Sequence, residues 1–532
     1  MRNKYLHWLP VLLMLCQAAD AQSAAPPINW QLLDWKSDGY PGMSVEKAYT
    51  QLLKGKKPQK KIIVAVIDDG LDDRHPDLAG MEWTNTREIP GNGIDDDHNG
   101  YVDDVHGWNF IGTTRQETYE EVREYVRLRK DSTAVNSGYW KMIVLEEQKK
   151  LDYLTQADQG TTKVIDAFVT LQAYWRKKLM QDSVYFLQVK KFRPDPSADT
   201  AVKAASDLIL SFTDQVSSAS DSATLQSLID KIGNYQHNTR QALTAAQTVI
   251  AQGDPAYFRR QAIHDDPYAA GQRGYGNGTT FPEDTHGTEC AGIIGALRSN
   301  PLSSMGITNA VRIMPLRINS MGHDCDEWDK DVANAIRYAV DNGAQVISMS
   351  FGKYISPQQA WVTEAIRYAE QKGVLLVHAA MNDGIDIDTV GSYPSAFGDE
   401  AHPASNFINV GASTYDSTLI GDFSNYGKKK VDVFAPGVAI YMTKINAQHD
   451  RGFGTSFACP MVAGVAALIW SYYPQLTYKQ VRECIERSAT PIDLMVTIPG
   501  SDKKAPFSSL CKTGGIVNAY RAIQYAQSLG PM

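Results

Sequence analysis

Three polar residues have the types needed for nucleophilic catalysis, and each stands beside an apolar run. Ser456 lies in GFGTSFACP, His286 opens HGTECAG, and Asp68 ends the run KKIIVAVID. A serine hydroxyl becomes a nucleophile when a histidine takes its proton, and a carboxylate can hold the other ring nitrogen of that histidine. Each residue also has an ordinary structural interpretation: a helix cap for Ser456, a helix start for His286 and a polar strand end for Asp68.

Such chemistry also needs a fixed donor for the negative charge that develops on the attacked carbonyl. Asn382 follows VLLVHAAM, so we expect it at the end of a buried strand with its amide N–H directed into a crevice. Taken alone, NDG is only a turn signal.

The segments that must position these residues alternate in character. The apolar runs are IIVAVI, VRIMPLRI, AQVISMSF, GVLLVHAA, FINVGAS and VDVFAP, and helix-like segments such as DKDVANAIRYAVDNG lie between them. Continuous apolar strands separated by amphipathic helices predict a mostly parallel sheet covered on both faces. Ligands bind at the carboxyl edge of such a sheet, and Asp68 is expected there.

Together, these blocks resemble the subtilisin-like serine peptidases, the subtilases. VIDDG with HPDL resembles the aspartate motif of the family, HGTECAG its histidine motif and GTSFACPMVAG its serine motif. The order Asp-His-Ser is that of subtilisin. VISMSFG resembles the substrate-pocket strand, and FSNYG and VDVFAPG resemble connecting segments. The resemblance implies a subtilisin-like three-layer α/β/α fold and a serine-type endopeptidase that needs no cofactor for catalysis.

The resemblance also implies a role for each motif residue. Ser456 would attack the scissile carbonyl, His286 would carry the proton to the leaving amine, and Asp68 would hold the imidazole. Asn382 and the backbone N–H of Ser456 would bind the oxyanion. Asp69 lies one place beyond the motif aspartate and receives no catalytic role.

A substrate pocket is implied in the same way. The residues that would form it are Ser350, Phe351 and Gly352 on one side and Ala379, Ala380 and Met381 on the other. Substrate would bind between them as an added strand. Met381 stands where the family has glycine, so we expect a narrowed S1 pocket that favours a small or slender residue at P1, the position directly before the cleaved bond.

Residues 85–110 contain an acidic loop. Oxygen-bearing residues at alternate positions with a glycine at the sixth resemble the first half of an EF-hand loop, but His106 stands at the twelfth position in place of glutamate. Because similar loops occur in calcium-binding subtilases, we expect a structural calcium site, with a solvated acidic turn as the alternative. The predicted ligands are Asp95, Asp97, Asn99, the carbonyl of Tyr101, and Asp103 or Asp104.

The start of the chain has the pattern of an export signal. Arg2 and Lys4 precede WLPVLLMLC, and Ala19-Asp20-Ala21 fits a cleavage site, so residues 1–21 are predicted to be a signal peptide. The mature protein is then periplasmic or extracellular, and no later segment is expected to span a membrane. The net charge of −8 gives no basic field for nucleic acid.

Further domain boundaries follow from changes in composition. Residues 22–61 form a lead-in with one helix, SVEKAYTQLL, which Ser44 is expected to cap. Residues 62–112 and 266–532 form the peptidase domain. The lead-in is too short for the full pro-domain that many secreted subtilases carry, so activation either needs none or uses another part of the chain.

Residues 113–265 are predicted to be an inserted all-helical module. They are rich in Gln, Lys, Glu, Ala and Leu and have long helical periodicity, as in YWKMIVLEEQKKLDYL. A Tyr/Trp/Leu stripe is expected to form the core of this module. Two roles are open for this module. It acts as a lid, an exosite or an arm for oligomer or partner contact, or it is a passive addition to the peptidase domain.

Five cysteines follow the signal, and they allow two arrangements. Cys484 and Cys511 form a pair, or all five are isolated thiols.

The sequence thus predicts an exported serine endopeptidase that acts on peptides or proteins through an acyl-enzyme. The alternative is a catalytically silent subtilase-fold scaffold that binds partners through its helical insertion. The presence of every triad and oxyanion residue argues against this alternative.

Overall fold

The computed structural model describes residues 26–135, 137–191, 193–211, 223–281, 285–299, 303–319 and 325–530. The predicted signal peptide lies outside them. The chain forms two compact units. The larger consists of Pro26–Arg115, Phe258–Met321 and Asp326–Met532, and the smaller is built mainly of Gln116–Tyr257.

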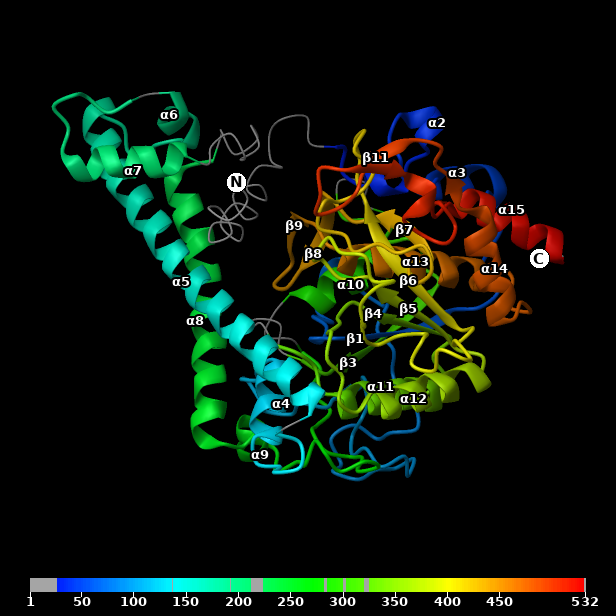
Figure 1. Ribbon diagram of the computed structural model, residues 1–532. Helices are drawn as coiled ribbons and strands as arrows, with labels where there is room; N and C mark the ends of the chain where they lie inside the picture. The colour runs from blue at the N-terminus through cyan, green and yellow to red at the C-terminus, as the bar shows by residue number, and fades with distance from the viewer. Residues whose placement is uncertain are drawn as a thin grey trace. The chain divides into compact units, whose positions relative to one another are not determined.

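A nine-stranded sheet forms the centre of the larger unit, in the order β10-β13-β7-β6-β5-β4-β1-β3-β2. Figure 1 shows the run from β7 through β6, β5, β4 and β1 to β3. Among the described strand pairs of this sheet, β10 and β13 alone run antiparallel. The strands are β1 (Ile62–Asp68), β2 (Trp108–Asn109), β3 (Val311–Arg317), β4 (Val346–Met349), β5 (Leu375–Ala379), β6 (Phe407–Ser413), β7 (Val433–Pro436), β10 (Thr490–Pro491) and β13 (Gly515–Ile516). The predicted mostly parallel sheet is confirmed.

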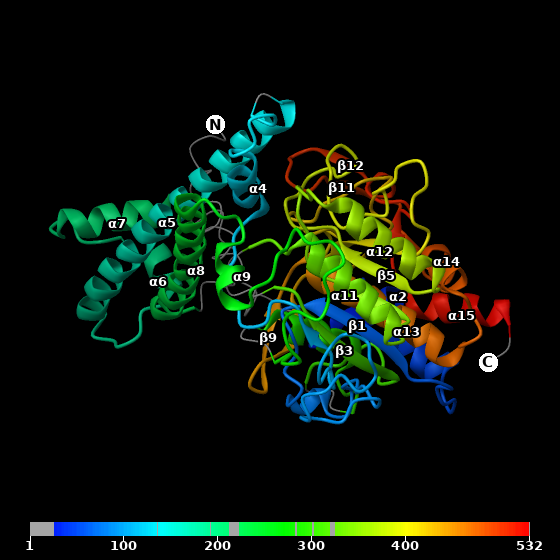
Figure 2. The same ribbon diagram turned by 90° about the horizontal axis from the view of Figure 1, so that it is seen from below.

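Helices cover both faces of this sheet because the side chains of each strand alternate between two apolar layers. In β1, Val64 and Val66 pack into one hydrophobic cluster, while Ala65 and Ile67 pack into the other. The helices of the first layer are α10 (His286–Gly295), α13 (Thr455–Tyr472), α14 (Tyr478–Ser488) and α15 (Ala519–Leu529). Those of the second are α11 (Asp329–Asp341) and α12 (Gln359–Gln371), which lie side by side in Figure 2.

The register of the central strands brings several predicted site residues to one edge of the sheet. Ile67 of β1 pairs with Met349, the last residue of β4, and Met349 pairs with His378 of β5. Asp68, Ser350 and Ala380 therefore come at or just after the carboxyl ends of three adjacent parallel strands. This is the edge at which an open α/β sheet binds ligands.

Helix α13 bears on the expectation that no segment after the predicted signal spans a membrane. Among the described residues, it is the one helix long and apolar enough to cross a membrane by length and composition, but 94% of it is buried inside the fold. Its uniform apolarity is explained by its place in the core, where other elements surround it on all sides.

The lead-in packs into the same core, with Trp30 and Leu32 fully buried. Its short elements are η4 (Trp30–Leu32), α2 (Trp35–Asp38), α3 (Val45–Lys47) and the π-turn η5 (Ala48–Leu52). The prediction that Ser44 caps the helix is wrong. Ser44 has a φ of 56°, and its hydroxyl donates to Asp34 at 2.9 Å and accepts from Asn518 at 3.0 Å instead.

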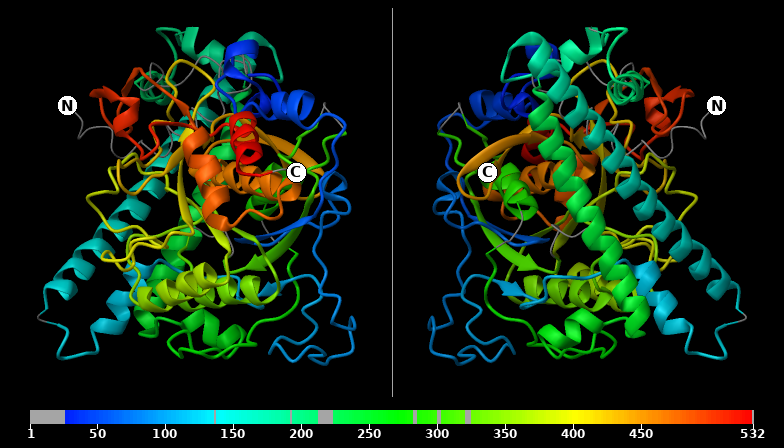
Figure 3. Two further views of the ribbon diagram at one scale, coloured as in Figure 1. Left: turned by 90° about the vertical axis from the view of Figure 1, so that its right-hand side faces the viewer. Right: turned by 90° about the vertical axis from the view of Figure 1, so that its left-hand side faces the viewer.

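The smaller unit is helical. Its elements are α4 (Glu120–Leu128), α5 (Gly138–Leu179), α6 (Phe186–Lys191), α7 (Thr200–Leu210) and α8 (Leu225–Gln252). The 42-residue α5 runs beside α8, as Figure 3 shows, and Val164, Phe168 and Ile232 belong to a hydrophobic cluster formed within this unit. The unit therefore has a core of its own.

The remaining short elements are α9 (Tyr257–Ala262), η6 (Pro76–Leu78), η9 (Phe507–Ser509), the hairpin β8 (Ile440–Lys444) and β9 (Gln448–Gly452), and the hairpin β11 (Met495–Thr497) and β12 (Lys504–Pro506). Cys484 and Cys511 are not paired: all five cysteines after the predicted signal are free thiols, and four of them are buried.

A buried ionic cluster ties α9 to α11. The guanidinium of Arg259 is 0% exposed and contacts Asp331 at 2.6 Å and Asp265 at 2.6 Å. Lys330 contacts the other oxygen of Asp265. Two cations and two carboxylates balance each other there, so removing one partner leaves a buried charge uncompensated.

We expect Arg259→Ala to lower the free energy of unfolding by about 3–5 kcal/mol, because Asp331 loses both of its charged hydrogen bonds. Urea denaturation measures this loss. Arg260→Ala is the matched control: its 3.7 Å contact with Asp266 is half-exposed and should contribute less than about 1 kcal/mol. Equal losses in the two variants would contradict the assignment.

Candidate active site

Asp68 and His286 meet at the end of β1 although they are 218 residues apart. Nδ1 of His286, the first residue of α10, lies 2.8 Å from Oδ1 of Asp68, whose side chain is 2% exposed. A carboxylate only accepts hydrogen bonds, so Nδ1 carries the proton of the neutral ring. Nε2 then holds the lone pair that a general base needs.

Asp69 holds the helix that carries His286. Its buried carboxylate accepts hydrogen bonds from the backbone N–H of His286 at 3.2 Å and of Gly287 at 2.6 Å. These are N–H groups of the first helical turn, which have no partner within the helix. A Cβ on Gly287 would lie 2.1 Å from the carbonyl oxygen of Gly70, so this close approach requires glycine.

Sequence reasoning missed this role of Asp69. Its two partners are 217 and 218 residues away, and a second carboxylate after a strand looks like any other polar turn residue. We regard Asp69 as a positioning residue, since its contacts are to the backbone of the helix.

The charges around His286 favour its protonated form. Burial lowers the pKa of His286, but the negative charges of Asp68, Asp69 and Glu289 outweigh burial and raise the pKa above the ordinary value of about 6.5. An imidazolium that forms when the ring accepts a proton is therefore stabilised.

Ser456 is the second residue of α13, at the start of a buried helix as expected. Gly454, just before this helix, has a φ of 152°, a region of backbone space open to glycine. The hydroxyl of Ser456 donates to the carbonyl of Ser350 at 3.3 Å. The thiol of Cys290, one turn beyond His286 in α10, donates to the carbonyl of Ser456 at 3.5 Å, so α10 and α13 meet at the site.

Two N–H donors lie close to Gly454. A Cβ built on this glycine would lie 3.6 Å from the backbone nitrogen of Ser456 and 3.7 Å from Nδ2 of Asn382. The side-chain oxygen of Asn382 accepts hydrogen bonds from the backbone N–H and the hydroxyl of Thr455, both at 2.9 Å, which fixes the orientation of the amide. Two N–H donors of this kind can hold the negative charge of an attacked carbonyl oxygen, and a side chain at residue 454 would fill the space beside them.

The two predicted pocket segments face each other. On one side, the hydroxyl of Ser350 donates to the carbonyl of Ser456 at 2.8 Å, and the ring of His378 bonds the carbonyl of Phe351 at 2.8 Å. On the other, Ala379 and Ala380 are buried at the end of β5. A Cβ on Gly352 would lie 3.0 Å from Sδ of Met381, so the methionine side chain packs against Gly352.

The acidic loop brings together only part of its predicted ligand set. Oxygens of Asp95 and Asp97 lie within 4.8 Å of each other and of an oxygen of Glu88, a residue that sequence reasoning missed. Glu88 is 6% exposed, and its Oε2 has no hydrogen-bond partner among the described residues. Burial and the charges of Asp104, Asp97 and Asp96 raise the pKa of Glu88.

The side chains of the other predicted ligands make contacts of their own, and the carbonyl of Tyr101 stays a prediction. Asp103 accepts hydrogen bonds from the backbone of Gly91, Asn92 and Gly93. Asp104 is fully buried and bonds Tyr338, Asn85 and Asn99, and the ring of Tyr101 packs against Trp108 and Tyr338. These side chains stiffen the loop around the three carboxylates.

A protein-family model described as the subtilase family matches residues 59–514, which is most of the chain. The chain belongs to the subtilase family. The resemblance that the motifs predicted is therefore confirmed, and this subtilase is a serine-type endopeptidase.

Two sequence relatives agree with this assignment. Thermitase from Thermoactinomyces vulgaris is 36% identical over 240 residues, which cover 45% of this chain and 75% of thermitase. The thermophilic serine proteinase of Bacillus sp. strain AK1 is 34% identical over 243 residues, covering 46% of this chain and 53% of that protein. Among solved structures, the prenylagaramide maturation protease PagA matches with a TM-score of 0.37 and 30% identity over 46% of this chain and 82% of that chain.

Asp69→Asn should move the acid limb of the pH profile of kcat/KM to lower pH. His286 must be neutral to act as a base, so activity rises as pH rises through its pKa. Removing the charge of Asp69 removes one of the causes that raise this pKa. The limb is measured with a peptide substrate from acid to alkaline pH, because the pKa of His286 is raised above its ordinary value.

Asp450→Asn is the control, because it removes the same charge from an exposed side chain. Its profile should match that of the wild type. An acid limb that stays in place in Asp69→Asn would refute the electrostatic part of this role.

Proposed function

We propose that this subtilase is an exported endopeptidase in which Ser456, His286 and Asp68 cleave peptide bonds through an acyl-enzyme. The observation that carries the proposal is the meeting of four segments at one sheet edge: the Asp68–His286 pair, the serine at the start of α13 and the Asn382 amide. Its substrates are peptides or proteins. The signal-like residues 1–21 support export to a periplasm or the medium.

We assign each step of the reaction to one of these groups. Oγ of Ser456 forms a bond to the scissile carbonyl carbon while its proton passes to Nε2 of His286. The negative charge on the carbonyl oxygen is held by Nδ2 of Asn382 and the N–H of Ser456. The carbon–nitrogen bond then breaks, and the leaving amine takes the proton from His286.

Hydrolysis of the acyl-enzyme repeats these steps with water. His286 takes a proton from water as the oxygen attacks the ester carbon, and it returns this proton to Oγ of Ser456 as the acid product leaves. Asp68 stays ionised throughout, holding Nδ1 and offsetting the charge of the imidazolium.

For the domains, we assign residues 62–112 and 266–532 to the peptidase and 113–265 to the helical insertion. The compactness of Gln116–Tyr257 supports this division.

Labelling with a fluorophosphonate probe tests the function. The wild type should be labelled, and Ser456→Ala should lose the label and about six orders of magnitude in kcat, as for the same triad in subtilisin. Ser509→Ala, at an exposed serine, should be labelled like the wild type. Folded wild-type protein that takes no label and cleaves no peptide would support the silent scaffold instead.

We further propose that the acidic loop holds a structural calcium ion through Glu88, Asp95 and Asp97. Three carboxylates at this spacing match the hard oxygen donors that calcium prefers. The Oε2 of Glu88 is buried and has no hydrogen-bond partner in the described part of the chain, which supports the fit because a bound cation would satisfy it. The ion would stabilise the loop and take no part in catalysis.

Removal of calcium should therefore lower the melting temperature. At a calcium concentration 100-fold above Kd, the bound ion adds about 2.7 kcal/mol to the free energy of unfolding. Thermal melts with and without a chelator measure the shift, which Glu88→Gln should largely abolish. Glu364→Gln, at an exposed residue, should keep the full shift. Identical wild-type melts in both conditions would show that the loop binds no ion.

A further inference from the structure

We propose that Met381, Tyr354 and Asp383 form a side-chain gate across the S1 pocket, and that this gate restricts the enzyme to small residues at P1. The proposal rests on the proposed function, because it assumes that the segments around Gly352 and Met381 line the pocket. It adds two residues, Tyr354 and Asp383, and names the substrate class.

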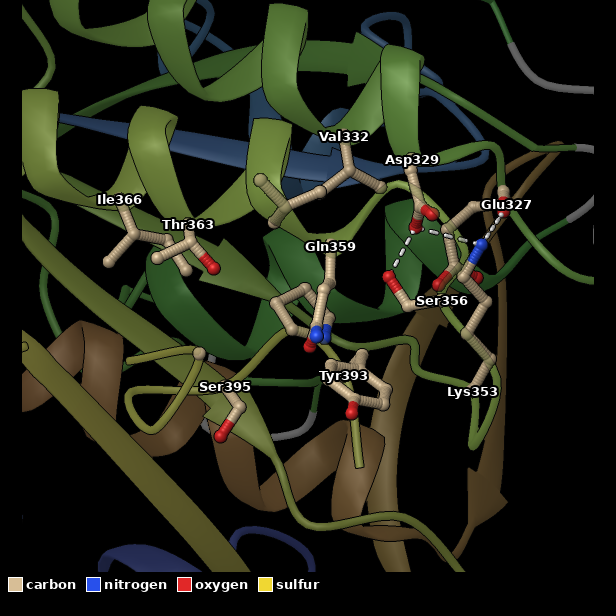
Figure 4. Close-up of a pocket in the computed structure, with 13 residues that line it drawn as sticks. Glu327, Asp329, Val332, Lys353, Ser356, Gln359, Thr363, Ile366, Tyr393 and Ser395 are labelled. Carbon is tan, nitrogen blue, oxygen red and sulfur yellow. Dashed lines mark hydrogen bonds and ion pairs between the residues drawn. The ribbon is translucent and has the colours of Figure 1, made fainter. Parts of the chain in front are cut away.

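The backbone wall of the pocket at Gly352 is held in place by the contacts of the next residue, Lys353. Lys353 follows Gly352 and is nearly fully buried, with its ammonium 3.0 Å from Asp329 and 2.8 Å from the carbonyl of Glu327 (Figure 4). Its backbone exchanges hydrogen bonds of 3.0 and 2.9 Å with Tyr393. Moving this wall would break a buried ion pair, so widening the pocket in that direction has a high free-energy cost.

Met381 occupies the space between the walls. It adopts a φ of 75°, a left-handed conformation that favours glycine and costs a residue with a side chain about 1 kcal/mol or more. Its Sδ and Cγ would lie 3.0 and 3.1 Å from a Cβ on Gly352. The side chain thus lies against the wall where a substrate side chain would enter.

Tyr354 and Asp383 join the two walls. The hydroxyl of Tyr354, two residues beyond Gly352, donates a hydrogen bond to the carboxylate of Asp383, the residue after Asn382. Burial and the charge of Asp383 raise the pKa of Tyr354, so the hydroxyl keeps its proton and remains a donor. A hydrogen bond to an ionised acceptor is stronger than one between neutral groups.

Asn425 fixes this bridge. Its Nδ2 donates to the hydroxyl of Tyr354 at 3.0 Å, and its Oδ1 accepts from the backbone N–H of Asp383 at 3.1 Å and of Ile385 at 3.0 Å. Its own N–H donates to the carbonyl of Met381 at 3.0 Å. One buried asparagine therefore ties both gate segments together.

A small P1 residue fits without disturbing these contacts, whereas a large one must displace Met381 or break the Tyr354–Asp383 bond. Tyr354 is half-buried and Asp383 exposed, so the gate can move while the walls stay fixed. The gate makes P1 alanine the preferred residue over leucine and phenylalanine.

The test compares kcat/KM for peptides that differ only at P1, with alanine, leucine, phenylalanine or lysine. Wild type should prefer alanine. Tyr354→Phe and Met381→Gly should each raise the ratio of kcat/KM for phenylalanine to kcat/KM for alanine about 10-fold or more, and the double variant should raise this ratio further. Tyr368→Phe is the matched control, since it removes a tyrosine–aspartate bond to Asp341 on the helices α11 and α12.

The outcomes separate this inference from the proposed function. Fluorophosphonate labelling with an unchanged P1 profile in all gate variants would refute the gate alone. Faster wild-type cleavage after lysine than after alanine would show that Asp383 pairs with a basic P1 residue and would overturn the small-residue assignment. Absence of labelling would refute the peptidase function and the gate with it.

Discussion

Asp68 and His286 form a 2.8 Å hydrogen bond although they are 218 residues apart in the sequence. The bond requires the end of strand β1 to meet the start of helix α10. An ionised carboxylate that is 2% exposed is costly unless it is paired and hydrogen-bonded. The pair is kept in place by Asp69, which caps the helix of His286, and by Gly287, whose missing side chain lets the helix approach the loop. Strand β1 and helix α10 are thus fixed relative to each other by contacts in which Ser456 takes no part.

The hairpin that leads to Ser456 aligns the serine with this pair. In β8, the hydroxyl of Thr443 donates to the carbonyl of Thr288 in α10 at 2.8 Å. Between its strands, the N–H of Asn446 donates to the carboxylate of Asp72, just after β1, at 2.9 Å. The segment that enters α13 is therefore bonded to both of the elements that carry Asp68 and His286. Positioning of this kind lets a catalytic group react at high effective concentration.

Much of this arrangement could be predicted from the sequence, because it follows from patterns within single segments. The apolar runs predicted the parallel sheet, and the motif residues Asp68, His286 and Ser456 stand at element ends where such a sheet gathers ligands. The cap assigned to Ser44 was wrong because local preference gave way to a tertiary bond with Asp34. The intrinsic preference of a residue for a helix position contributes less free energy than such tertiary contacts.

The parts that sequence reasoning missed are contacts between distant segments. Glu88 joins Asp95 and Asp97 only through the path of its loop, and Arg259 meets Asp331 across 72 residues. The Tyr354–Asp383 bridge likewise joins residues from two strand ends. None of these pairs has a spacing or residue pattern that marks it, so only the fold shows which polar groups are partners.

The central claim is that Ser456 and His286 act as one catalytic unit, and comparison of kcat for Ser456→Ala, His286→Ala and the double variant tests it most directly. If the serine needs the histidine to remove its proton, either single change already removes the whole pathway. The double variant should then retain the same residual kcat as each single variant. Losses that multiply in the double variant would show that the two residues contribute independently, and would contradict the account.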